Sequence, residues 1–154
     1  MSKYPISKEF FPFSHFTPPI SEKFLAMAVP NMKTPKFIWK DKDLDVVRYE
    51  VESYDGEKIE VFLMSPKALG KNAPCLVYLH GGGFVLAAAG YHYKNAMYYA
   101  KEVGCKVLFV NYRLAPEHKH PVFFEDCYAA FCWAYDNTET LGINSCSLSV
   151  VRWA

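Results

Sequence analysis

The sequence predicts an α/β fold built on a mostly parallel sheet, and three observations support this prediction. Two segments of apolar residues flank the dipeptide Asp55-Gly56. Short apolar runs, typical of strands that are buried on both faces, recur after them. Amphipathic helical patterns separate these runs. Strands that alternate with helices are joined by right-handed crossovers, so this order of elements forms the opening half of a mostly parallel sheet.

The first predicted element is a β-hairpin. Residues 45–53 alternate apolar and polar side chains, and a second apolar segment, residues 59–64, follows Asp55-Gly56. An Asp-Gly turn between two such segments is the strongest short-range signal for a hairpin.

The remaining predicted elements follow in order along the chain. Apolar composition predicts strands at residues 74–79, 106–110 and 148–151. The first helix, residues 91–103, ends at Gly104 and has apolar positions at Tyr91, Ala96, Tyr99, Ala100 and Val103. The second helix, residues 123–135, has Pro121 near its start and apolar positions at Phe124, Tyr128, Phe131 and Tyr135.

The N-terminal residues 1–40 differ from this core, residues 41–154, because they are rich in aromatic residues and prolines. Proline fixes φ and removes a hydrogen-bond donor, so long regular elements are not expected there, apart from a short helix over residues 21–28 with Ser21 as N-cap. We expect this segment to pack on the core as an arm or partial cap. The alternative is an arm that only covers the sheet.

Composition excludes several classes of protein. A length of 154 residues suggests one domain, and 51% hydrophobic residues can fill its core. The net charge of +1 gives no electrostatic field that would gather nucleic acid or an anionic membrane. No apolar run approaches the roughly 18 residues of a membrane span. Charged and proline residues interrupt the N-terminal apolar residues, which argues against a secretory signal.

The cysteines indicate a reducing compartment. The chain has five cysteines and no C-x-x-C pair, a pattern that fits the reduced thiols of a cytoplasmic protein better than a disulfide framework. Four of them lie in apolar runs and are expected to be buried: Cys75, Cys105, Cys127 and Cys132.

The candidate site begins with the glycines that follow strand 74–79. The string His80-Gly81-Gly82-Gly83-Phe84 leaves several backbone N–H groups unshielded by any Cβ atom. Such a nest of donors can hold a developing oxyanion, with Gly82 and Gly83 as the expected donors. A tight structural turn is the alternative. A phosphate-binding loop is excluded because no Gly-Lys-Ser/Thr follows.

A second string, Tyr112-Arg113-Leu114-Ala115-Pro116-Glu117-His118, begins 28 residues after Phe84. Together the two strings resemble those of the hormone-sensitive-lipase-like branch of the α/β-hydrolases, the family IV esterases. The resemblance covers roughly residues 45–151. It implies an α/β-hydrolase fold and hydrolysis of small- or medium-chain carboxylic esters, without a cofactor.

The resemblance also implies roles for individual residues. Gly82 and Gly83 would bind the oxyanion, and His80 would support their loop together with Gly81 and Phe84. His80 is not the expected general base, because in this fold the catalytic histidine follows the nucleophilic serine in the chain. Arg113 and Glu117 would form ionic links that fix loops near the active site, and the N-terminal segment would contribute to a cap.

His118 and His120 form an H-x-H pair, which raises the possibility of a metal site. No cluster of cysteines or carboxylates at metal-binding spacing accompanies them, apart from the adjacent Glu117. We therefore expect two surface histidines and no metal.

The C-terminal residues depart most from the resembled family. That family continues with Gly-Asp-Ser-Ala-Gly after a strand like residues 148–151, whereas this chain reads Arg152-Trp153-Ala154 and contains no Gly-x-Ser-x-Gly. All three members of the catalytic triad are therefore expected beyond Ala154. A frameshifted or truncated gene, and an inactive fragment, are the hypotheses that follow. The alternatives are a non-catalytic binding or regulatory remnant of the same fold, and a chain that pairs with a separately encoded second half.

Overall fold

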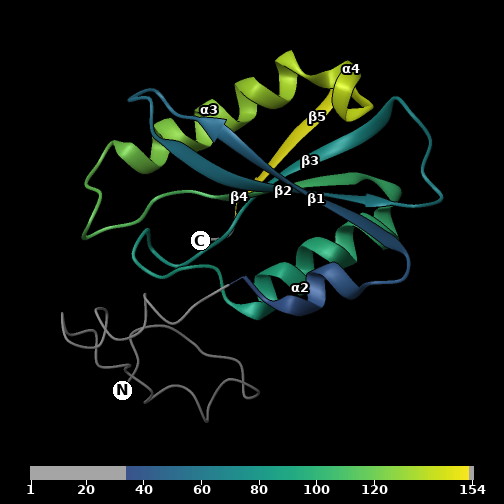
Figure 1. Cartoon of the computed structure of the whole chain (residues 1–154), viewed down its shortest axis with the longest axis horizontal. Coiled ribbons are helices and arrows are strands. Elements are labelled where there is room, and N and C mark those ends of the chain that lie inside the picture. The colour runs from purple at the N-terminus through teal and green to yellow at the C-terminus, as the bar shows by residue number, and fades with distance from the viewer. Residues whose placement is uncertain (1–33, 153–154) are drawn as a thin grey trace, which may run out of the picture.

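The computed structural model describes residues 34–152. One five-stranded sheet forms its centre, with the strand order β1-β2-β4-β3-β5. Helices α3 and α4 cover one face of this sheet and α2 covers the other (Figure 1). Of the predicted arm, residues 1–40, the structure describes only residues 34–40, and Ile38 in this part is fully buried in a core cluster. The short helix predicted over residues 21–28 lies outside the described residues.

The predicted hairpin is confirmed. Strands β1 (Leu44–Glu52) and β2 (Lys58–Pro66) pair antiparallel, with Val51 opposite Ile59. In the turn, the N–H of Gly56 donates to the carbonyl of Ser53 at 3.0 Å. Gly56 has a φ of +82°, a left-handed conformation that a residue without a Cβ atom adopts at little cost.

The three predicted strands after the hairpin are also confirmed. Strands β3 (Ala73–Leu79), β4 (Lys106–Asn111) and β5 (Ile143–Arg152) are parallel to one another, and β2 is antiparallel to β4. The sheet is thus mixed but mostly parallel. Strand β5 begins five residues earlier than predicted, because Ile143 already pairs with Ala73 before an irregularity in the register. Strand β5 forms one edge of the sheet.

Both predicted helices form, and two short elements were not predicted. Helix α2 (Gly90–Tyr99) continues as one π-type turn, η4 (Ala100–Gly104), and α3 spans Val122–Asp136. The unpredicted elements are a 3-10 helix, η3 (Lys36–Lys40), and the four-residue helix α4 (Thr138–Leu141).

Of the apolar positions named for the second helix, only Phe131 packs against the core cluster that α3 covers. Phe124, Tyr128 and Tyr135 are 51%, 67% and 55% exposed, whereas the residues that face the sheet are Phe123, Asp126, Ala130 and Ala134. Alanines at 130 and 134 allow the helix backbone to lie close to the strands. Asp126 is drawn inward by polar partners from other elements. The rule that large apolar side chains mark the buried face therefore fails here by about one residue.

The apolar positions named for the first helix also include exposed side chains. Tyr91 and Val103 are 61% and 66% exposed. Ala96 and Ala100 are fully buried, together with His92, Tyr93 and Met97. The ring of Tyr93 stacks on Phe109 of β4 with centroids 4.3 Å apart. This stacking fixes α2 on the sheet.

Two apolar clusters hold the layers together, one on each face of the sheet. Cys75 lies in the first and Cys105 in the second, so burial of these two thiols is confirmed. Burial raises the pKa of Cys75 to about 12, which keeps this thiol protonated and unreactive. Cys127 and Cys132 are only half-buried. None of the helices in residues 34–152 has the length and apolar character needed to cross a membrane.

Candidate active site

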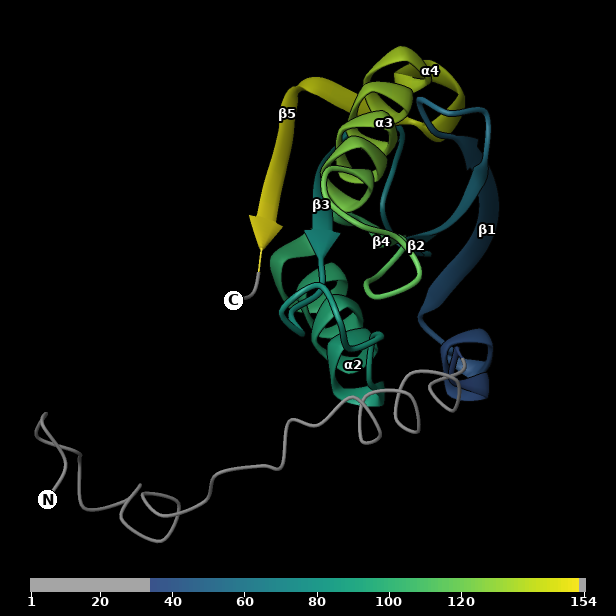
Figure 2. The ribbon, with the colours of Figure 1, turned by 90° about the vertical axis from the view of Figure 1, so that its left-hand side faces the viewer.

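The glycine loop lies at the edge of the sheet where its parallel strands end. It follows β3 directly, and Leu79, the last residue of β3, pairs with Arg152 at the end of β5. Figure 2 shows that β3 and β5 point in the same direction and end at the same level. Ligands of open α/β sheets bind at the carboxyl ends of the strands, so this edge is the expected place for a site.

The backbone of the loop requires glycine at one position in particular. Gly82 has a φ of +135°, and a Cβ atom added to it would lie 2.5 Å from the carbonyl oxygen of Leu86. That contact is sterically forbidden. The carbonyl of Gly82 also accepts hydrogen bonds from the N–H groups of Val85 and Leu86, at 3.1 and 3.0 Å. Gly83 has a φ of +61° but open space around it, so only its backbone conformation favours glycine.

Two backbone donors of this loop are available to a ligand. Within residues 34–152, the N–H groups of Gly82 and Gly83 donate to no acceptor. Gly82 is half-buried and Gly83 is exposed. Adjacent backbone donors beside a tight turn are the type of arrangement that binds anions in other proteins.

His80 holds the start of this loop through contacts with Tyr112 and Gly81. Its ring is 2% exposed and stacks on Tyr112, with centroids 4.3 Å apart and planes 7° from parallel. The Nδ1 of His80 donates to the carbonyl of Gly81 at 2.8 Å, and the hydroxyl of Tyr112 donates to the carbonyl of His80. Burial lowers the pKa of His80 to about 4, so the ring is neutral at pH 7.

This pKa predicts a pH dependence of stability. Between about pH 6.5 and 4, the unfolded chain binds a proton at His80 that the folded chain excludes. The free energy of unfolding should therefore be fully retained above pH 6.5. It should fall by about 3 kcal/mol for this group as the pH is lowered toward 4. Urea unfolding of the wild type and of His80→Asn at several pH values measures the difference in slope. Exposed His120→Asn is the control, and equal slopes for wild type and His80→Asn would contradict the prediction.

Phe84 connects the loop to the second motif. Its carbonyl accepts a hydrogen bond from the N–H of Ala115 at 2.8 Å. Its ring stacks on Phe123 of α3, with centroids 4.1 Å apart. Phe84 has a φ of +63°, which is uncommon for a residue with a side chain. These two contacts compensate for that conformation and keep the loop in one position.

Arg113 joins three elements behind the loop. Its guanidinium donates to both carboxylate oxygens of Asp126, with the shortest contact at 2.6 Å, and to both oxygens of Asp55, at 2.7 and 3.0 Å. The backbone N–H of Arg113 and the hydroxyl of Ser53 also donate to Asp126, at 2.9 and 2.6 Å. Hydrogen bonds from Arg113 lower the pKa of Asp55. The network ties the hairpin turn and α3 to the segment that holds the glycine loop.

This network differs from the ionic links that the sequence led us to expect. Glu117 is exposed and forms no ion pair with any other residue in the described part of the chain. The partners of Arg113 are Asp126 and Asp55, which sequence reasoning missed. One feature of the sequence could have indicated Asp126. It lies among the apolar residues of a helix, and a carboxylate that is buried there needs a cation as its partner.

The structure describes both members of the histidine pair, His118 and His120. Among residues 34–152, no three or more histidine, cysteine or acidic side chains are grouped so as to hold a metal ion. His118 is half-buried. The exposed ring of His120 meets Phe123 and Phe124 edge-on, at 5.8 and 5.6 Å.

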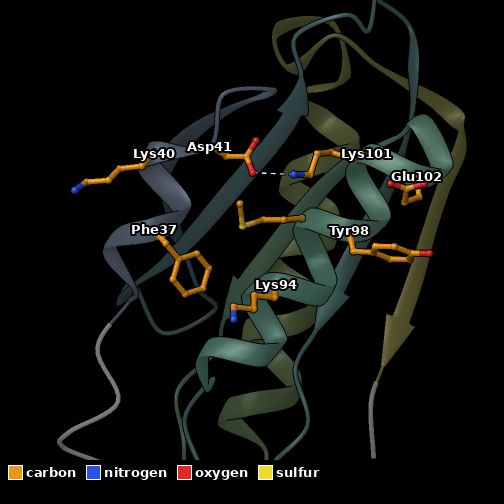
Figure 3. Close-up of a pocket in the computed structure, with 8 residues that line it drawn as sticks. Phe37, Lys40, Asp41, Lys94, Tyr98, Lys101 and Glu102 are labelled. Carbon is orange, nitrogen blue, oxygen red and sulfur yellow. Dashed lines mark hydrogen bonds and ion pairs between the residues drawn. The ribbon is translucent and has the colours of Figure 1, made fainter.

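A pocket of about 590 Å³ lies between η3 and α2, and the glycine loop does not line it (Figure 3). An ion pair of 2.8 Å between Lys101 and Asp41 spans it, and the ammonium of Lys94 lies 5.8 Å from the ring centroid of Phe37. The first contact joins the end of η3 to η4, and the second joins η3 to α2. Because its lysines are accompanied by Asp41 and Glu102, the pocket offers no strong charge of one sign to a ligand.

Comparison with known proteins agrees with this geometry. Residues 76–151 match the model of a protein family that is described as having the α/β-hydrolase fold. Over 90 residues the chain is 39% identical to carboxylesterase NlhH of Mycobacterium tuberculosis, and this match covers 58% of this chain and 28% of that protein. Over 109 residues it is 29% identical to the hormone-sensitive lipase of Bos taurus, with 63% and 14% covered. A solved esterase of Pyrobaculum calidifontis superimposes with a TM-score of 0.68 at 34% identity, covering 75% of this chain and 37% of the other.

The chain therefore belongs to the α/β-hydrolase superfamily, and the predicted fold is confirmed. Within this superfamily it belongs to the branch of the hormone-sensitive-lipase-like carboxylesterases. The chain spans less than a third of the length of both curated relatives.

Proposed function

We propose that this chain supplies the oxyanion loop of a serine carboxylesterase that transfers the acyl group of small- or medium-chain esters to water. The free N–H groups of Gly82 and Gly83, at the carboxyl edge of a sheet shared with esterases, carry this proposal. As a serine attacks the ester, the carbonyl oxygen gains negative charge. Two fixed donors would stabilise that charge without reorganisation, and one donor of this kind typically contributes about 2.7–4 kcal/mol to the transition state.

The position of β5 supports the rest of the mechanism. Leu79 and Arg152 are neighbours in the sheet, so the end of β5 lies beside the start of the glycine loop. A nucleophilic serine on a turn at that point would lie close to both donors, as the chain order of this superfamily requires. A histidine and an acid from later segments would then activate the serine and orient the base.

We expect the 154-residue polypeptide by itself to be inactive. Loss of the nucleophile or base of a serine-hydrolase triad lowers kcat by about 10⁶-fold. The purified chain should show no hydrolysis of p-nitrophenyl acetate or butyrate above background. Turnover that survives purification and disappears when one of the chain's own serines is replaced would contradict this expectation. It would also leave the alternative of a non-catalytic remnant without support.

A chimera tests the parent activity. Residues 1–151 would be joined to the remainder of the related Pyrobaculum calidifontis esterase, starting where its corresponding strand ends. We expect hydrolysis of p-nitrophenyl butyrate, and loss of it when the nucleophilic serine of the added part is replaced by alanine. A folded chimera without activity would contradict the proposal that this loop serves as an oxyanion site.

A further inference from the structure

Arg152 brings a positive charge to the glycine loop. It is the last described residue of β5 and pairs with Leu79, the residue before His80. The central carbon of its guanidinium lies 5.2 Å from the ring centroid of Phe84. At this distance a guanidinium and an aromatic ring attract each other, so the cation is held over the loop while it remains exposed.

The charge of Arg152 is free to act on a ligand. Within residues 34–152 its guanidinium forms no ion pair. Its field reaches the interior beside the loop, because it opposes the rise in pKa that burial causes at Tyr112 and Cys127. The nearest arginine in the sequence, Arg113, differs in this respect, since two carboxylates neutralise it.

Hydrogen-bond donors and aromatic rings lie near one another at this edge of the sheet. The N–H groups of Gly82 and Gly83 are free donors of the loop backbone. The guanidinium of Arg152, at the end of β5, adds five N–H donors in one plane. Phe124 is 51% exposed, with its ring centroid 5.7 Å from that of Phe84. Because the ring of Phe84 stacks on Phe123 and lies under the guanidinium of Arg152, the exposed ring of Phe124 is the apolar surface beside it.

We propose that the glycine loop and Arg152 form a binding site for a carboxylate that carries a short apolar tail. The carboxylate would accept hydrogen bonds from Gly82, Gly83 and Arg152, and its tail would lie against the exposed ring of Phe124. This site needs no nucleophile, so it can operate in a chain that hydrolyses nothing. The backbone donors are the same as those in the proposed function. Binding does not depend on hydrolysis, however, so each proposal can be contradicted without the other.

The test uses the 154-residue protein labelled with ¹⁵N and titrated with sodium butyrate at constant ionic strength and pH 7. We expect saturable downfield shifts of the Gly82 and Gly83 amide protons in the millimolar range. Arg152→Gln should weaken binding about tenfold, the factor expected for loss of one charge-assisted hydrogen bond. Arg152→Lys should have an intermediate effect, because an ammonium keeps the charge but loses the fork.

Two controls make the result specific. Arg48→Gln removes an exposed arginine that pairs with Glu50 and Glu60 on the hairpin, and it should leave butyrate binding unchanged. Butyramide, which is neutral and has the same tail, should cause no saturable shift. Absence of saturation with butyrate, equal affinity in wild type and Arg152→Gln, or equal binding of butyramide would each overturn the proposal. An inactive chimera together with butyrate binding would instead count against the esterase function alone.

Discussion

Replacement of Asp126 by alanine should destabilise the fold by about 3–5 kcal/mol, because it leaves Arg113 without its buried partner. Asp126 is fully buried and accepts hydrogen bonds from the guanidinium and backbone of Arg113 and from the hydroxyl of Ser53. Removing the carboxylate leaves the hydroxyl of Ser53 and the backbone N–H and Nε–H of Arg113 without their acceptor, while the rest of the guanidinium keeps Asp55. Urea unfolding followed by circular dichroism gives the free energy of unfolding.

The matched control is Glu125→Ala. Glu125 precedes Asp126 on α3, carries the same charge and forms no ion pair with another residue of the described range. We expect a change within about 0.5 kcal/mol. A double-mutant cycle of Asp126→Ala with Arg113→Ala should show strong coupling. If Asp126→Ala costs no more than Glu125→Ala, the network does not hold the loop in place.

The second large effect is expected for Gly82→Ala in the active chimera. A Cβ atom at Gly82 would lie 2.5 Å from the Leu86 carbonyl, and its φ of +135° is one that other residues rarely adopt. The loop must therefore move, which takes its N–H groups away from the oxyanion. We expect kcat to fall about 10²–10³-fold, the usual cost of one lost oxyanion donor, with little change in KM.

Two other glycines serve as controls for this substitution. Gly70→Ala should leave kcat unchanged, since nothing lies within 4 Å of the added Cβ atom and its φ is ordinary. Gly83→Ala should have a smaller effect than Gly82→Ala, because the left-handed conformation costs only about 1–2 kcal/mol and no atom blocks the side chain. A rise in KM with unchanged kcat for Gly82→Ala would show that the glycines only shape a pocket.

Local patterns in the sequence were sufficient to predict the elements and their order. The alternation around Asp55-Gly56 placed the hairpin, and the apolar runs placed β3 and β4 to within a residue. These patterns are local consequences of side-chain periodicity and of the conformational freedom of glycine, so they can be read without knowing the fold. The glycine string and the Tyr112-Arg113 string also located the candidate site along the chain.

Contacts between side chains of different elements could not be predicted in this way. The buried face of α3 was set by close packing of Ala130 and Ala134 against strands and by the pairing of Asp126 with Arg113, which depends on residues from other elements. The proximity of Arg152 to Phe84 likewise follows from the parallel register of β3 and β5. Contacts between segments far apart in the sequence leave no periodic pattern, and for this reason the fold had to place them.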